Sequence, residues 1–220
     1  MEDVPLPPAS ISFDWPSGPP GQYCSRDFMA FGSNRDKILA VDSTGDTYLY
    51  DAAVHSIRFS TNMPMMLQRV MKPMSAAVGD HGLFVMSGID HQFAALMVGR
   101  NHNDCNWQPN WPWQSLRPPP FPGRLQQQPY PFEIGAYTAV GDQFWVSTVG
   151  AGTFRFDTES GAWSKIRPWA LPFRGRVEYV PEHRLWIGFS DRGEPKELCA
   201  SDLALAAAAG PDTGVAEPGE

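Results

Sequence analysis

Several features are scarce or missing in this sequence, and each absence excludes a class of protein. Only three cysteines occur among the 220 residues, and their wide spacing is a poor framework for disulfides. No Asn-x-Ser/Thr acceptor site occurs, and no apolar run reaches the roughly 18 residues that a membrane helix needs. The N-terminus lacks the basic and apolar segments of a signal peptide. We therefore expect an intracellular protein of the cytoplasm or nucleus, without membrane contact.

Positive charge is also in deficit. The sequence has 17 Lys and Arg against 24 Asp and Glu, which gives a net charge of −7. An acidic chain has no electrostatic reason to bind a phosphate backbone, so we expect no nucleic-acid partner. Hydrophobic residues make up 42% of the chain and charged residues 19%, which is the balance of a globular protein.

Helical periodicity is nearly absent between the two ends of the chain. Instead, short apolar runs alternate with turn residues, and the sequence has 22 Pro, 20 Gly and 12% aromatic residues. This pattern predicts an all-β protein of short strands. We expect a proline-rich lead-in over residues 1–27, with one short edge strand at 11–15, a body of repeats over 28–202, and an Ala/Gly-rich disordered tail over 203–220.

A strand–turn–strand unit recurs four times along this body. Each copy has an apolar run, a turn of Gly, Asp, Asn or Pro, and a second, more apolar run. The copies span residues 28–42, 76–88, 136–148 and 177–190. Their second runs are expected to centre on Leu39, Phe84, Trp145 and Trp186, which recur about every 50 residues.

A second shared pattern follows two of these units. Residues 47–57 read TYLYDAAVHSI and residues 153–163 read TFRFDTESGAW, so that Asp51 aligns with Asp157 and Ile57 with Trp163. We interpret each as a hairpin between a third and a fourth strand, with Asp bonding turn amides and the large residue packing between repeats. In the middle copy, residues 91–98 and 107–116 would supply the same two strands.

Four short antiparallel strands in about 50 residues match the size of a β-propeller blade. A single such blade cannot bury both of its faces, whereas radially stacked blades cover one another. The sequence therefore predicts a partial or small propeller of about three blades, plus the start of a fourth.

The aromatic-Asp pair followed by Trp resembles kelch repeats, most clearly at Phe156-Asp157 with Trp163. Further segments, at 41–58, 75–86, 111–121, 152–190 and 197–203, are similar to a kelch-like family of unknown function that is abundant in grasses. This resemblance implies a propeller-like fold and no particular activity. The paired kelch glycines after the second strand are missing, and a closed propeller typically needs at least four blades. One interpretation is that the chain is a truncated family member with an exposed blade edge.

No group of residues stands out as catalytic, cofactor-binding or metal-binding. His102, Asp104 and Cys105 lie close together, but no second ligand pair accompanies them, so a polar loop is preferred. The residues at 117–122, RPPPFP, could be a polyproline ligand, and the preferred interpretation is a stiff connection between blades.

Four residues are candidates for contact with a protein partner. Arg174 and Arg176 alternate on one predicted strand face, although pairing with Glu178 and Glu182 would explain them as ordinary surface charges. Trp111 and Trp113 are predicted to pack between blades, and an exposed one could be a binding hot spot.

The preferred function is a non-enzymatic protein-interaction module that presents loops from a propeller scaffold. One alternative is a small-molecule binder or enzyme with a site at the propeller channel. The other is a truncated, non-functional family member.

Overall fold

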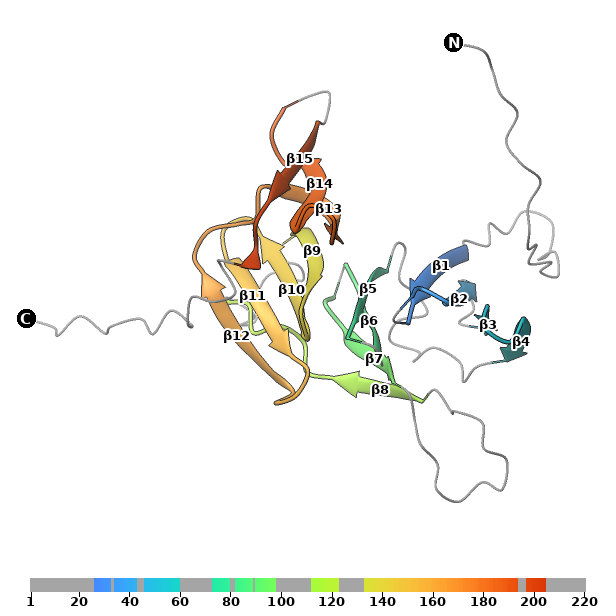
Figure 1. Ribbon diagram of the computed structural model, residues 1–220. Helices are drawn as coiled ribbons and strands as arrows, with labels where there is room; N and C mark the ends of the chain where they lie inside the picture. Colours follow the sequence, from blue (N-terminus) through green and yellow to red (C-terminus); the bar gives the residue numbers. More distant parts are fainter. Residues whose placement is uncertain are drawn as a thin grey trace, which may run out of the picture.

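The computed structural model describes residues 26–32, 34–42, 46–59, 73–79, 82–88, 90–97, 112–122, 133–193 and 197–204. Antiparallel β-strands dominate this part of the chain, and they are arranged as successive blades of a β-propeller (Figure 1). The all-β prediction is confirmed. No helix within these ranges is long and apolar enough to cross a membrane.

The first two blades are separate four-stranded sheets in which each strand pairs with the next along the chain. Blade 1 consists of β1 (Arg26–Phe31), β2 (Lys37–Asp42), β3 (Thr47–Asp51) and β4 (Ser56–Phe59). Blade 2 consists of β5 (Met74–Val78), β6 (Gly82–Met86), β7 (Phe93–Met97) and β8 (Trp113–Leu116). The strands expected within 91–98 and 107–116 are therefore present, the latter only from Trp113 among the described residues.

The third and fourth blades are joined into one seven-stranded sheet. Blade 3 consists of β9 (Ile134–Val140), β10 (Gln143–Thr148), β11 (Gly152–Asp157) and β12 (Ala162–Arg167), and blade 4 of β13 (Phe173–Val180), β14 (Leu185–Ser190) and β15 (Leu198–Ser201). The join is a short parallel pairing of β9 with β13, the innermost strands of the two blades. Blade 4 thus has one strand more than the opening hairpin that the sequence predicts.

Three clusters of buried apolar side chains lie between successive blades and form the core. The cluster between blades 1 and 2 includes Leu39, Leu49, Leu83 and Leu96. The cluster between blades 2 and 3 is largely aromatic, with Phe84, Phe93, Phe121, Phe144, Phe154 and Phe156. The cluster between blades 3 and 4 includes Trp145, Ile166, Phe173, Trp186 and Leu203. Radial stacking therefore buries faces that a lone blade would leave in water.

The outer hairpins of blades 1 and 3 have the predicted equivalence. Tyr50 pairs with Ile57 and Phe156 pairs with Trp163, in the same register relative to the turn. Asp51 accepts a hydrogen bond from the Ala53 amide, and Asp157 accepts bonds from the amide and hydroxyl of Ser160. These hairpins confirm the alignment of Asp51 with Asp157.

The expected equivalence of Trp186 with Trp145 is wrong by one residue. Trp186 belongs to the cluster between blades 3 and 4, and it therefore faces the preceding blade. The β9–β10 turn closes through two residues, with Val140 opposite Gln143, whereas the β13–β14 turn closes through four, with Val180 opposite Leu185. The equivalent of Trp145 is consequently Ile187, because a shift of one residue moves a side chain to the other face.

Some sequence predictions fall outside the described residues. These are the edge strand at 11–15, the histidine-cysteine loop at 102–105, Trp111, and nearly all of the tail. Leu203, the first residue of the predicted tail, is buried against blade 3 in the last core cluster.

Candidate functional site

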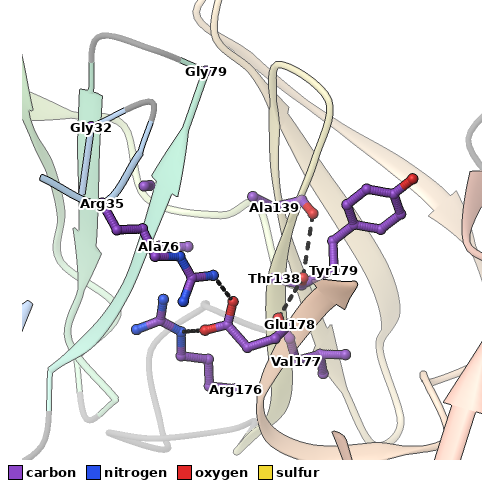
Figure 2. Close-up of a pocket in the computed structure, with 11 residues that line it drawn as sticks. Gly32, Arg35, Ala76, Gly79, Thr138, Ala139, Arg176, Val177, Glu178 and Tyr179 are labelled. Atoms are coloured by element: carbon purple, nitrogen blue, oxygen red, sulfur yellow. Dashed lines mark hydrogen bonds and ion pairs between the residues drawn. The ribbon is translucent and has the colours of Figure 1, made fainter. Parts of the chain in front are cut away.

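A pocket of about 300 Å³ lies where the four innermost strands approach one another (Figure 2). We call it the axial pocket. Its lining comes from all four blades: Gly32 and Arg35 from the β1–β2 hairpin, Ala76, Ala77 and Gly79 from β5 and its turn, Thr138 and Ala139 from β9, and Arg176, Val177, Glu178 and Tyr179 from β13. Residues far apart in the sequence thus share one cavity.

The Glu178 carboxylate occupies the centre of the charged group in this pocket. Arg35 pairs with its Oε2 atom and Arg176 with its Oε1 atom, and Figure 2 shows both guanidinium groups directed at the carboxylate. Two positive charges and one negative charge leave one positive charge in excess. The axial pocket is therefore locally cationic in a protein whose net charge is −7.

The local backbone explains how these side chains are presented. Arg35 adopts a positive φ of 53°, and its amide donates to the carbonyl of Gly32 at 3.0 Å, which closes the tight β1–β2 turn. In β13 the pairing with β14 shifts register between Arg174 and Glu178, and Gly175 has a φ of 77°. Such a bulge bends the strand locally and redirects its side chains.

A buried hydroxyl fixes the wall between blades 3 and 4. Thr138 is 1% exposed, and its Oγ1 donates to the carbonyl of Val177 at 2.8 Å. This bond continues the interaction of β9 with β13 beyond their two parallel pairs. Because that hydroxyl is engaged, and because the other lining residues include no serine, cysteine or histidine, the described pocket lacks a nucleophile paired with a base.

The charged groups of the pocket remain partly solvated. Side-chain exposure is 57% for Arg35 and 38% for Glu178, so their pairing adds little to stability. On the neighbouring strand β9, Tyr137 pairs with Arg176; burial raises the pKa of its hydroxyl, and the nearby positive charge of Arg176 partly offsets this effect. Guanidinium groups bind carboxylates and phosphates through paired hydrogen bonds, so this arrangement is suited to holding an anion.

The structure separates the four residues that the sequence suggests for partner contact. Arg176 lines the axial pocket. Arg174 is outside it, with a 52% exposed side chain whose guanidinium lies 3.7 Å from the Glu133 carboxylate. Trp113 packs from β8 against the cluster between blades 1 and 2, and Trp111 lies outside the described residues. The expected pairing of Arg176 with Glu178 is present.

Arg35 and Tyr179 are two pocket residues with charged or aromatic side chains that sequence reasoning missed. Arg35 occupies an ordinary-looking hairpin turn, and its partner is 143 residues away. The one available signal is the repeat itself, since inner hairpins of successive blades lie at the same end of a propeller. A charged residue at the turn of one repeat is therefore a candidate to meet a charged residue near the turn of another.

The proline-rich segment at 117–122 has a structural role. Phe121 of the proline-rich segment is 4% exposed and stacks edge-on against His91 and Phe154. The carbonyl of Arg117 in the same segment accepts a hydrogen bond from the indole of Trp163 at 2.7 Å. This segment is therefore a packed connection between blades, and its aromatic residue is not available to a polyproline-binding module.

A second, more open depression of about 600 Å³ lies beside the β9–β10 and β11–β12 turns. Its acidic lining residues include Asp157, whose pKa is lowered by the hydrogen bonds from Ser160. Within the described part of the chain, no three His, Cys, Asp or Glu residues are grouped as a metal site would require.

Comparisons with known proteins give a family and solved structures of limited similarity. The family model described as "Protein of unknown function (DUF1668)" matches residues 1–217. The β-propeller domain of Myceliophteria thermophila Cps50 (Swd1) superposes with a TM-score of 0.45 at 14% identity, over 75% of this chain and 49% of that one. The dihydro-heme d1 dehydrogenase NirN gives a TM-score of 0.38 at 13% identity, over 79% of this chain and 34% of that one. The chain thus spans about half the length of the first and a third of the second. No curated protein sequence matches.

Proposed function

The chain belongs to the DUF1668 family of proteins of unknown function, and on that premise we propose that it is an intracellular, non-enzymatic protein-interaction module of kelch-like type. Its binding site is the axial pocket with the exposed side chains around it, and its partner presents an acidic segment. The observation that carries this proposal is the convergence of Arg35 and Arg176 on the single carboxylate of Glu178.

The charge arrangement supports an acidic partner for two reasons. The two guanidinium groups are partly exposed, at 57% for Arg35 and 32% for Arg176, so a carboxylate of a partner can pair with them beside Glu178 at a smaller desolvation cost than buried charges would impose. Tyr179, which is 42% exposed beside the pocket, adds a large amphipathic side chain of the kind that is enriched at protein interfaces. The hydrogen-bonded β1–β2 turn presents Arg35 and strand β13 presents Arg176, and such preorganised groups lower the entropy cost of binding.

Affinity capture from the native tissue tests the proposal with matched variants. The bait is the full chain as wild type, as the double variant R35E/R176E, and as the control R192E, which alters an exposed arginine beyond the other end of β14. We expect a specific protein to be recovered by the wild type and R192E and lost with R35E/R176E. Equal recovery by all three baits would contradict the assignment of the axial pocket.

The size of the axial pocket favours a second candidate, a small anionic ligand. A volume of about 300 Å³ is at the lower end of the range for small-molecule sites. Thermal-shift titration with small dicarboxylates and with inorganic phosphate distinguishes the two candidates. Saturable stabilisation of the wild type that R35E/R176E abolishes favours the small ligand, whereas no shift leaves the protein partner as the preferred candidate.

A further inference from the structure

The charged side chains of the axial pocket leave one positive charge in excess. The lining contains two arginines, Arg35 and Arg176, and one carboxylate, Glu178. Next to Arg35 in the chain, Asp36 and Lys37 form an ion pair at 2.9 Å, so these two residues add no net charge. A ligand group with a single negative charge therefore neutralises the pocket, whereas a group with two negative charges leaves it negative.

The two guanidinium groups have donors left for such a ligand. A guanidinium carries five N–H groups, yet Arg35 contacts Glu178 through Nη2 and Arg176 contacts it through Nε. Within the described part of the chain, neither arginine makes another hydrogen bond or ion pair. Figure 2 shows both guanidinium groups on the same side of the carboxylate. An anion placed beside Glu178 can therefore accept hydrogen bonds from both.

Glu178 is held in this position by its two neighbours in β13. Val177 is 3% exposed, and its carbonyl accepts the hydrogen bond from the Thr138 hydroxyl. On the other side, the ring of Tyr179 packs on Trp186 with 4.5 Å between the ring centroids. Both oxygens of the Glu178 carboxylate are also engaged by guanidinium groups. A ligand anion in the axial pocket therefore meets a positioned negative charge.

A single excess charge favours a ligand of low charge for a physical reason. The attraction of an anion to the pocket grows in proportion to the charge of the anion, whereas the cost of removing the anion from water grows with the square of that charge. Glu178 opposes the two guanidinium groups and offsets about half of their attraction. A doubly charged group therefore loses its hydration in exchange for a weakened attraction.

We propose that Glu178 makes the axial pocket selective for a carboxylate, such as an aspartate or glutamate side chain of the partner, over a phosphate group. A carboxylate carries one negative charge, whereas a phosphate group on a protein carries about 1.5 to 2 at pH 7. This selectivity rests on the proposed function, because it concerns the anion that the axial pocket receives. It adds the residue that determines the choice, and it means that the partner is bound in its unphosphorylated form.

NMR titration of the full chain with sodium acetate and with sodium sulfate, at constant ionic strength, tests this selectivity. Acetate represents a carboxylate side chain, and sulfate represents a phosphate group with a fixed double charge. We expect the wild type to bind acetate more tightly than sulfate. We expect E178Q to bind sulfate about tenfold and acetate about threefold more tightly than the wild type does, because the repulsion removed is proportional to the ligand charge. The control E182Q removes the same charge from the exposed β13–β14 turn, and both dissociation constants are expected to stay within about twofold of the wild type.

The double variant R35E/R176E shows whether the anions bind in the axial pocket, and it is expected to bind neither. A wild type that prefers sulfate overturns the inference, and so do equal effects of E178Q and E182Q or equal gains for the two anions in E178Q. If no binding depends on Arg35 and Arg176, the inference is overturned together with the assignment of the axial pocket. Failure to capture a protein partner would instead contradict the proposed function alone, because these titrations use small anions.

Discussion

Arg35 and Glu178 are 143 residues apart in the chain, and their side chains form an ion pair that links blade 1 to blade 4. Every core cluster joins blades that are neighbours in sequence. This pair instead brings the two terminal blades together across the axial pocket, and Arg176 pairs with the same carboxylate from blade 4.

Neutralising Glu178 is expected to have a small and salt-dependent effect on stability. The variant E178Q removes the charge that separates two guanidinium groups, but these groups are partly exposed and water screens their repulsion. We expect a loss below about 1 kcal/mol in the free energy of unfolding, and a smaller loss in high salt. Urea denaturation at low and high salt measures it, with E182Q in the exposed β13–β14 turn as the control. A loss that is large and independent of salt would show that Glu178 has a packing role instead.

Trp163 is expected to contribute more than its position on an outer strand suggests. W163A removes ring contacts with Phe93 and Phe156 together with the hydrogen bond to the Arg117 carbonyl, and we expect a loss of about 3 kcal/mol. W163F keeps an aromatic ring but loses the hydrogen bond and a part of the ring contact, and a loss of about 1 kcal/mol is expected from the hydrogen bond. Chemical denaturation of the pair compares them, and equal losses would contradict this division between packing and hydrogen bonding.

Gly152 is expected to tolerate no side chain. Its φ is 91°, and a Cβ atom there would lie 2.4 Å from the carbonyl oxygen of Arg167. Gly161 is the matched control, because its φ of 66° is similarly left-handed but a Cβ atom at that position would have no neighbour within 4 Å. We expect G161A to cost about 1 kcal/mol, from backbone strain alone, and G152A to cost clearly more. Similar melting temperatures for the two variants would contradict the steric argument.

The lowered pKa of Asp157 predicts that folding stability depends on pH through the β11–β12 turn. Hydrogen bonds from the Ser160 amide and hydroxyl favour the ionised carboxylate and lower the folded-state pKa from 3.8. A lowered folded-state pKa means that the stabilisation is complete above the unfolded-state value and is lost as the pH falls through the folded-state value. Comparing the free energy of unfolding of the wild type and D157N from pH 7 to pH 2 is expected to show that D157N loses less stability in acid. If the free energies of unfolding of the two proteins fall in parallel as the pH is lowered, the stability of the turn does not depend on this charge.

The sequence predicts the blades well because each repeat has a local pattern of apolar runs and turn residues. Asp51 and Asp157 precede equivalent turns, so their alignment holds in three dimensions. It misplaces Trp186, because a four-residue turn instead of a two-residue turn changes which face a residue occupies, and large apolar residues occur on both faces of a blade. For Arg35 the sequence offers only its place at the inner turn of a repeat, since its particular partner depends on how blades are arranged around an axis and not on any spacing along the chain.

The stacking of blades in chain order has a consequence for synthesis on the ribosome. Blade 2 can dock on blade 1 before blade 3 has been made, because the cluster between them needs no residue beyond Trp113. Each later blade then adds to a surface that already exists, so no long loop has to close before burial begins. The pairing of Arg35 with Glu178 joins the first blade to the last and must wait until blade 4 emerges, which makes it a late event in the maturation of the nascent chain.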